Sequence, residues 1–152
     1  MQSWSKHQTI NVDFQLQTTL NEILSIKDSL MSIESNSIRV SIIDIRPAEN
    51  FVNDGVTRSY NFVLIGDETG TTFLVVLDLA PEVLKTEYTY DITKIRRKTF
   101  NETYILSTTI DTHISLSKST INPNIDDISK IMNIDLVDVK TIITAVMEFE
   151  QQ

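Results

Sequence analysis

Short apolar runs separated by polar turns dominate the chain between residues 38 and 116. The clearest pair is Tyr60–Ile65 and Phe73–Leu77, which flank Gly66-Asp67-Glu68-Thr69-Gly70. Both runs are of strand length and rich in aromatic and β-branched residues, and glycine with aspartate between such runs indicates a tight turn. Gly70 stands where a short hairpin loop needs a residue at positive φ. The stretch is therefore predicted to be a β-hairpin.

The same pattern predicts three more strands, over Ile38–Arg46, Glu87–Lys98 and Thr103–Leu116. The first ends before Pro47, which lacks the N–H that a strand ladder needs. A polar loop is expected over Pro47–Thr57, with Asp54-Gly55 as its turn. The last strand is expected to be interrupted around Asp111.

The spacing of two isoleucines predicts an irregularity in the strand Glu87–Lys98. Ile92 and Ile95 are both apolar but three residues apart, which breaks the period of two. An extra residue in one strand of a pair restores the alternation, so we expect a bulge near Thr93 or Lys94.

Helices are predicted on either side of these strands. After a loose arm over residues 1–13, apolar residues recur at spacings of three and four over Phe14–Ile33, which indicates an amphipathic helix. The polar run Glu34–Ser37 ends it. One or two helical turns are expected over Leu79–Thr86, where Pro81 is tolerated near the start.

This order of elements predicts a known fold. Five strands with a helix between the third and the fourth is the order of the OB fold, a five-stranded Greek-key barrel. Ile, Val and Thr make up 50 of 152 residues and Ala only 3, which favours strands over a helical bundle. We predict a mainly β chain with an N-terminal arm and helix over 1–37, a barrel over 38–118 and a C-terminal helical segment over 119–152.

The C-terminal segment carries an apolar stripe with the spacing of a helix. Its members are Ile125, Ile128, Met132, Leu136, Val139, Ile143 and Val146. The pair Asp135 and Asp138 could instead cap a second helix after a break near Asn133, so one helix and two helices are both open. Residues Ile128 to Val146 of the stripe are the predicted partner-binding surface.

The net charge is −8, and half of it lies in residues 119–152, which carry two basic and six acidic side chains. An acidic chain is a poor general binder of polyanions, so a nucleic-acid contact must depend on a local basic patch. The one such cluster is the run over residues 94–98, followed by Phe100.

On a regular strand Lys94, Arg96 and Lys98 would share one face, near Tyr104. One interpretation is a phosphate-binding groove with an aromatic stack, and the other is a solvated edge strand whose charges prevent aggregation. Arg58 and Tyr60 would extend the same surface, while Phe51 is either an exposed aromatic contact or a plug in the barrel mouth. The predicted nucleic-acid contacts are Phe51, Arg58, Tyr60, Lys94, Arg96, Lys98, Phe100 and Tyr104.

Several kinds of chemistry find no support in the sequence. The chain has no cysteine, and His7 and His113 are isolated from any nucleophile or carboxylate at a recognisable spacing. Asp67 and Glu68 are expected to form the turn rather than a metal or acid–base site. We expect neither an enzyme nor a cofactor, and a protein without a membrane span or secretory signal, located inside the cell in the nucleus.

Three stretches resemble the OB-fold single-stranded DNA-binding proteins of the replication protein A type. They read IRVSIIDIRP, VLIGDETGTTFLVVLD and YDITKIRRKTFNETYILS, and together they span roughly residues 38–116. The turn Gly66–Gly70 is the most specific part of the likeness, followed by the strand pair with Phe100 near its turn. The C-terminal helical segment also resembles that family, in whose subunits such helices assemble into bundles.

The resemblance implies that single-stranded DNA crosses the barrel face made by the second and third strands. It implies a stacking role for Phe100, and such stacking contributes about 1–3 kcal/mol per base. The sequence departs from the family pattern at Leu77, Arg96 and Ser107, where the family places platform residues. These departures predict a weaker stacking platform.

The leading prediction is a subunit of a replication protein A-like complex that binds single-stranded DNA in replication, repair or telomere maintenance. Other OB-fold subunits would dock on its C-terminal helix. Two alternatives are open: an OB-fold scaffold without nucleic-acid binding of its own, and a barrel that binds RNA or tRNA.

Overall fold

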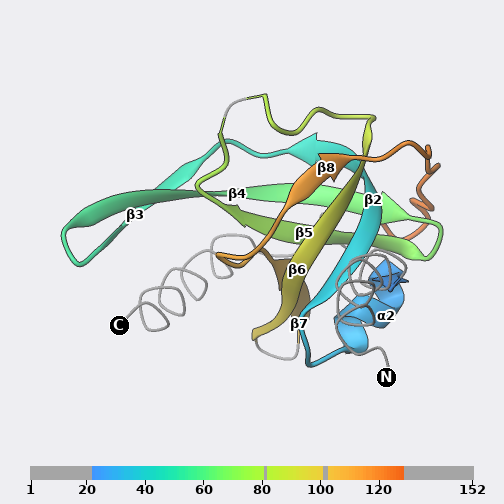
Figure 1. Cartoon of the computed structure of the whole chain (residues 1–152), viewed down its shortest axis with the longest axis horizontal. Coiled ribbons are helices and arrows are strands. Elements are labelled where there is room, and N and C mark those ends of the chain that lie inside the picture. Colours follow the sequence, from blue (N-terminus) through green and yellow to red (C-terminus); the bar gives the residue numbers. More distant parts are fainter. Residues whose placement is uncertain (1–21, 81, 101–102, 129–152) are drawn as a thin grey trace, which may run out of the picture.

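The computed structural model in Figure 1 describes residues 22–80, 82–100 and 103–128. For Asn53 and Phe100 this description covers the backbone alone. The elements in chain order are β1 (Ile23–Leu24), α2 (Ile26–Met31), β2 (Asn36–Ile45), β3 (Glu49–Asn53), β4 (Val56–Asp67), β5 (Gly70–Leu77), β6 (Thr89–Phe100), β7 (Thr103–Ser107) and β8 (Ile114–Leu116).

Five of the strands pair in a closed circuit, which we call the five-strand ring. Its order is β2, β4, β5, β7 and β6, and β6 returns to β2. Only the β5–β7 contact of the ring is parallel. Closing a sheet in this way gives each strand two neighbours and so removes open edges. The remaining strands each add to one member, β1 to β2, β3 to β4 and β8 to β6.

The inner side of the ring holds the main core. Every ring strand contributes to it, as expected of the inside of a closed sheet, and α2 adds Ile26. Along β4 the inward residues Val63 and Ile65 alternate with Phe62 and Leu64, which face out. Four of the fully enclosed core residues are Ile38, Val40, Ile92 and Ile95.

The predicted hairpin and the predicted bulge are both confirmed. β4 and β5 pair from Tyr60–Leu77 to Asp67–Gly70, and Gly70 has a φ of 143°. On β6, Lys94 has a φ of 56°, and the β2–β6 register shifts so that both Ile92 and Ile95 reach the core.

The predicted helix over Phe14–Ile33 is confirmed only over Ile26–Met31 and is wrong over the described residues before them. Ile23 and Leu24 form a short parallel pair with β2, and α2 covers only Ile26–Met31. Ser25 explains the late start, because its hydroxyl accepts a hydrogen bond from the N–H of Asp28 at 3.1 Å and caps the helix. Residues 14–21 lie outside the described part of the chain.

The helix predicted over Leu79–Thr86 is also wrong, since the described residues of this segment form turns. Glu82, within the segment, has a φ of 67°, which an α-helix does not accommodate. The segment instead directs Leu84 into the core, where it is 5% exposed.

The loop predicted over Pro47–Thr57 contains a strand. β3 pairs with the first half of β4, and Figure 1 shows this hairpin reaching out of the ring as an arm. The predicted turn is confirmed, because Asp54 and Gly55 both have positive φ, as a two-residue hairpin loop of this twist requires. Phe51 anchors β3 by packing against β4.

The expected interruption near Asp111 is confirmed. β7 ends at Ser107 and β8 begins at Ile114, and the two strands pair with different parts of β6, residues 96–100 and 90–92. Between them the hydroxyls of Thr109 and Thr112 both donate to the carbonyl of Lys94, at 2.8 and 2.9 Å.

After β8 the described chain returns to the β4–β5 hairpin. The N–H of Ile121 donates to the hydroxyl of Thr89, and the N–H of Asn124 donates to the carbonyl of Asp67 at 2.8 Å. The hydroxyl of Thr71 donates to Asp127 at 2.9 Å. The structure describes this segment only as far as Ile128. The rest of the predicted C-terminal helical segment, residues 129–152, lies outside the described residues. Among the described helices, none is long and apolar enough to cross a membrane.

Candidate nucleic-acid interface

A second apolar cluster covers the outer side of β4, β5 and β7, and we call it the aromatic layer. It consists of Phe51, Tyr60, Phe62, Leu64, Phe73, Val75 and Ile105. Consecutive rings from Phe51 through Tyr60 and Phe62 to Phe73 have centroids 5.8 to 5.9 Å apart in tilted or edge-on contacts. Such geometry is favourable between aromatic rings.

Strand alternation builds this layer. Phe62 pairs with Val75 and Leu64 with Phe73, so these side chains lie on the same side of the sheet. The neighbouring residues point into the ring, which makes both faces of β4 and β5 apolar. This explains the continuous apolar runs in the sequence.

Two arginines border the layer. The guanidinium carbon of Arg46 lies 5.9 Å from the ring centroid of Phe73, and that of Arg58 lies 6.0 Å from that of Phe51. Both distances suit a cation–π interaction. Arg46 was not among the predicted contacts, although it ends the predicted strand Ile38–Arg46, because its approach to Phe73 depends on the pairing of β2 with β4.

Arg58 is also held by an acid. Its guanidinium donates to Asp78 at 2.6 and 3.0 Å, and the N–H of Ser59 donates to the same carboxylate at 3.1 Å. Burial raises the pKa of Asp78, but the hydrogen bonds from Arg58 and Ser59 outweigh it and hold that pKa below its ordinary value. The ion pair with Asp78 therefore fixes the position of the Arg58 guanidinium beside the aromatic layer.

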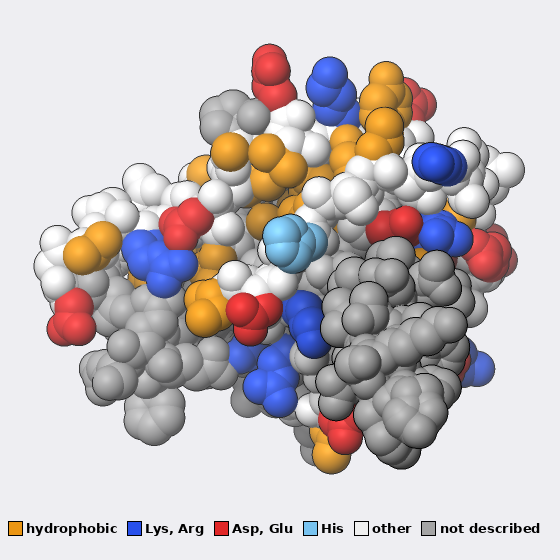
Figure 2. All heavy atoms as spheres, in the orientation of Figure 1, with side chains coloured by type: hydrophobic (Ala, Val, Ile, Leu, Met, Phe, Trp, Pro, Cys, Tyr) orange, Lys and Arg blue, Asp and Glu red, His pale blue; other side chains and the backbone are white. Residues whose placement is uncertain are grey.

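The basic run on β6 is divided by its bulge. Arg96 pairs with Ser107 and Lys98 with Ile105, which places these two cations beside the aromatic layer. Figure 2 shows basic side chains gathered over the part of β6 that pairs with β7. Beyond the bulge Lys94 belongs to another region, so the predicted common face of Lys94, Arg96 and Lys98 is wrong at Lys94.

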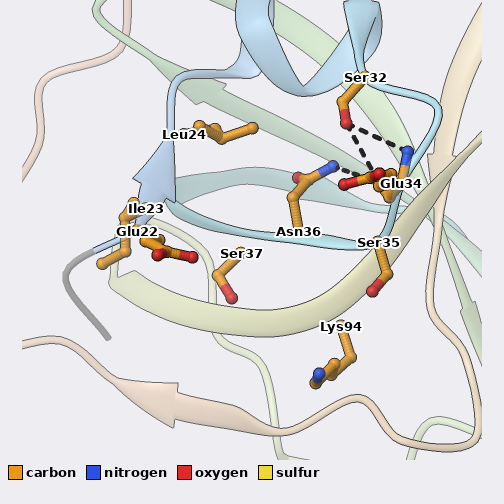
Figure 3. Close-up of a pocket in the computed structure, with 9 residues that line it drawn as sticks. All are labelled: Glu22, Ile23, Leu24, Ser32, Glu34, Ser35, Asn36, Ser37 and Lys94. Atoms are coloured by element: carbon orange, nitrogen blue, oxygen red, sulfur yellow. Dashed lines mark hydrogen bonds between the residues drawn. The ribbon is translucent and has the colours of Figure 1, made fainter. Parts of the chain in front are cut away.

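Lys94 lines a polar hollow of about 520 Å³ between β1, the end of α2 and the start of β2 (Figure 3). Within it the carbonyl of Glu34 accepts hydrogen bonds from Ser32 and Asn36. These bonds occupy the polar groups of the loop among themselves. Among the described residues that line the hollow, Lys94 is the only cation and there is no aromatic ring, so they offer no stacking surface for a base.

Arg97 and Tyr104 form a separate pair on the other side of β6 and β7. The guanidinium carbon of Arg97 lies 4.4 Å from the ring centroid of Tyr104, and the guanidinium donates to the carbonyl of Leu30 at 3.2 Å. Tyr104 thus contacts Arg97 and not the face of Arg96. The backbone of Phe100 pairs with Thr103 at the end of β6.

Five of the eight predicted contacts therefore fall into two groups, whereas Lys94 and Tyr104 lie elsewhere and only the backbone of Phe100 is described. Phe51, Arg58 and Tyr60 meet at the arm, and Arg96 and Lys98 border the far side of the same layer. Phe51 and Tyr60 are only 5% and 3% exposed, so of the two interpretations of Phe51 the structure favours the packed one.

Asp67 forms the turn, as predicted. Its carboxylate accepts hydrogen bonds from the N–H and the hydroxyl of Thr69, at 2.8 and 2.6 Å. Among the described residues, no three His, Asp or Glu side chains converge in a way that could hold a metal ion.

Sequence comparisons find neither a family model nor a curated protein that matches this chain. Solved structures are similar to it. The OB domain of Ta0387 from Thermoplasma acidophilum is 22% identical with a TM-score of 0.54, over 68% of this chain and 94% of that one. The OB domain of MM0293 from Methanosarcina mazei is 14% identical with a TM-score of 0.50, over 66% and 87%.

A third similar structure is a replication protein A heterotrimer bound to single-stranded DNA. It is 16% identical with a TM-score of 0.56, and the match covers 67% of this chain but 27% of that one. Likeness at these identities shows the fold alone. The prediction of a mainly β chain with the OB fold is confirmed, whereas the N-terminal helix is short and the predicted C-terminal helix lies beyond the described residues.

Proposed function

We propose that this chain binds single-stranded DNA as an OB-fold subunit of a replication protein A-like complex. The observation that carries the proposal is the aromatic layer on β4 and β5, bordered by Arg46, Arg58, Arg96 and Lys98. β4 and β5 are the second and third strands of the ring along the chain. OB folds bind oligonucleotides on the face of these two strands.

The cations supply the part of the interface that tracks phosphates. Four phosphate contacts to a single strand would give a slope of about −3 in a plot of log affinity against log salt. Stacking of bases on the neighbouring aromatic rings requires these rings to become exposed, because no member of the aromatic layer is more than 5% exposed. The arm formed by β3 and β4 lies where the loop before the second OB strand contacts nucleic acid in such folds.

Fluorescence anisotropy of labelled oligo-dT at low and moderate salt tests the proposal. The double substitution Arg96→Ala with Lys98→Ala should weaken binding about tenfold or more at low salt. Lys85→Ala with Lys118→Ala removes the same charge from exposed positions away from the layer and should leave affinity nearly unchanged. Absence of binding at tens of micromolar by the unaltered chain would refute the proposal.

The scaffold alternative is favoured by one observation, the burial of the layer. No member of the aromatic layer is more than 5% exposed, so none offers an open stacking face as it stands. In this second proposal the barrel serves as a protein-interaction module, and other OB-fold subunits dock on the stripe Ile128–Val146. Sedimentation of the unaltered chain and of the Leu136→Asp variant tests whether the stripe mediates assembly. If both proteins are monomers at every concentration, self-assembly through the stripe is excluded.

The same barrel surface also suits RNA, and matched DNA and RNA oligomers would separate the two ligands, since only RNA offers the 2′-hydroxyl. A preference for DNA supports a role in replication, repair or telomere maintenance. In that role the protein would work in the nucleus.

A further inference from the structure

The aromatic layer is an outer surface that behaves like a core. It lies on the outside of the ring, yet Phe62, Phe73 and Val75 are at most 1% exposed. Monomeric proteins rarely leave a large contiguous apolar surface in contact with water, and this layer has seven apolar members. Such a surface therefore needs a cover from outside the ring.

The described chain identifies where that cover begins. The partly buried apolar residues packed on the layer are Ile43 and Leu77, both from ring strands, and Ile128, which follows all of the strands. In contrast, α2 buries Ile26 in the inner core. Ile128 is thus the point at which the C-terminal segment meets the layer.

The path to Ile128 is fixed by contacts with the β4–β5 hairpin. The N–H of Asn124 bonds to the carbonyl of Asp67, and the carboxylate of Asp127 accepts from the hydroxyl of Thr71. Pro123 lies so close to Gly66 that a Cβ on that glycine would be 2.6 Å from the proline Cβ. These contacts deliver the chain to the outer side of β4 and β5.

The sequence that follows Ile128 has the apolar spacing of an amphipathic helix, which could cover the layer. Ile128 opens an apolar stripe that continues with Met132, Leu136 and Val139 at spacings of four, four and three. On a helix these residues follow one another along one face, about 5.4 Å apart per turn. A stripe whose first member packs on the layer is placed to continue over it.

Charge favours the same arrangement. Residues 126–152 carry six acidic and two basic side chains. The layer is bordered by Arg46, Arg58, Arg96 and Lys98. An acidic amphipathic segment thus offers both an apolar face for the rings and carboxylates for the cations around them.

We infer that the C-terminal stripe from Ile128 to Val146 docks on the aromatic layer of its own ring and occludes the surface assigned to single-stranded DNA. The docking stands on the contacts above, whereas the competition with DNA rests on the proposed function. A stripe docked in this way is not free to bind a partner subunit at the same time.

A distance measurement tests the docking without nucleic acid. The chain has no cysteine, so cysteines introduced at exposed Thr57 and at Glu148 can be spin-labelled uniquely in the full chain. We expect a narrow distance distribution, which broadens when Leu136→Asp and Ile143→Asp place charges on the stripe. The matched control, Thr141→Asp with Thr144→Asp, adds the same charge off the stripe and should keep the narrow distribution.

Three results would overturn the docking: a broad distribution in the unaltered chain, no change in the stripe variant, or loss of the signal on dilution with unlabelled protein. The last result would mean that the stripe docks on a second copy. Circular dichroism shows whether the stripe variant keeps its strands. If it does not, the milder variant Asp135→Asn with Asp138→Asn must broaden the distribution, or the docking fails.

Oligo-dT anisotropy on the same variants then tests the competition. If the docked state is nine times as populated as the open one, the stripe variant should bind oligo-dT about tenfold more tightly than the unaltered chain. Equal affinity of the two would overturn the competition. Docking with no oligo-dT binding by any variant would sustain the docking and refute the proposed function, so the two failures are distinguishable.

Discussion

The carboxylate of Asp67 accepts a hydrogen bond from the N–H of Ile26 at 2.7 Å, across 41 residues of sequence. The same carboxylate orders its own turn through Thr69, and the carbonyl of Asp67 accepts from Asn124 at 2.8 Å. One residue of the β4–β5 turn therefore joins both the N-terminal helix and the C-terminal segment to the ring.

Replacing Asp67 by alanine should lower the free energy of unfolding by about 2–3 kcal/mol, because the buried N–H of Ile26 and the partly buried N–H of Thr69 lose their acceptor. Urea denaturation followed by circular dichroism measures the change. Glu68→Ala alters the exposed neighbour in the same turn and should change stability by less than about 0.5 kcal/mol. Equal effects of the two substitutions would contradict a joining role for Asp67.

Gly66→Ala should destabilise the contact between the hairpin and the C-terminal segment. The added Cβ would lie 2.6 Å from the Cβ of Pro123 and 2.9 Å from Cδ1 of Ile43, so both contacts must be relieved, the second by a movement of the Ile43 side chain. Overpacking of this kind costs about 1–3 kcal/mol. The same urea titration measures it, and Gly66→Ala with Pro123→Gly, which removes the clashing Cβ, should destabilise no less than Gly66→Ala alone if the clash with Pro123 is not the cause.

The ion pair of Arg58 and Asp78 predicts a dependence of stability on pH. Because the folded-state pKa of Asp78 is lowered, its contribution is fully present above the unfolded-state pKa of about 3.9 and is lost as pH falls through the folded-state pKa. The Asp78 side chain is 49% exposed, so solvent screening limits the contribution to less than about 1 kcal/mol.

The difference in unfolding free energy between the unaltered chain and Asp78→Asn measures this contribution. We expect it to be constant from pH 7 down to about pH 5 and to shrink below pH 4. A difference that instead grows on acidification would have the wrong sign for a lowered pKa.

Arg97 should matter for stability and not for nucleic-acid affinity. It lies over the ring of Tyr104 and donates to the carbonyl of Leu30, away from the aromatic layer. Arg97→Ala is expected to cost about 1–2 kcal/mol of unfolding free energy. Arg96→Ala, one position away, should do the opposite, with little effect in urea and a clear loss in anisotropy. Matching losses of affinity would place both arginines on the binding face.

These adjacent arginines show how far the sequence could be interpreted. Alternation correctly predicted the hairpin and the need for a bulge near Lys94, because both follow from the period of two. Alternation could not show that the bulge separates Lys94 from Arg96. The position of the extra residue in β6 depends on its pairing with β2, which the local pattern does not contain. Nor could alternation assign Tyr104 to Arg97, because that depends on the register of β7.

The missed elements have physical causes as well. The spacing of Ile23, Ile26 and Leu30 suits a helix, but the side chain of Ser25 caps the helix late and leaves Ile23 to pair with β2. The sequence predicts a loop at β3 because Phe51 is its main buried apolar residue within a polar stretch. Its strand geometry comes from pairing with β4, which a local pattern does not contain.

Arg46 is the contact that sequence alone did not reveal, and it gives the sharpest test of the candidate interface. Its guanidinium carbon lies 5.9 Å from the ring centroid of Phe73, at the border of the aromatic layer. If it binds a phosphate, Arg46→Ala should weaken oligo-dT binding and reduce the salt slope by about 0.7, the value for one phosphate contact to a single strand. Arg46→Lys keeps the charge and should retain most of that slope.

Lys85→Ala serves as the control, since it removes one exposed charge from a residue that is not part of the aromatic layer. The slope distinguishes a phosphate contact from a packing role, because lost packing against Phe73 would weaken binding equally at every salt concentration. An unchanged slope in Arg46→Ala would therefore remove Arg46 from the interface, and it would leave the cations of β6 and Arg58 to account for the affinity.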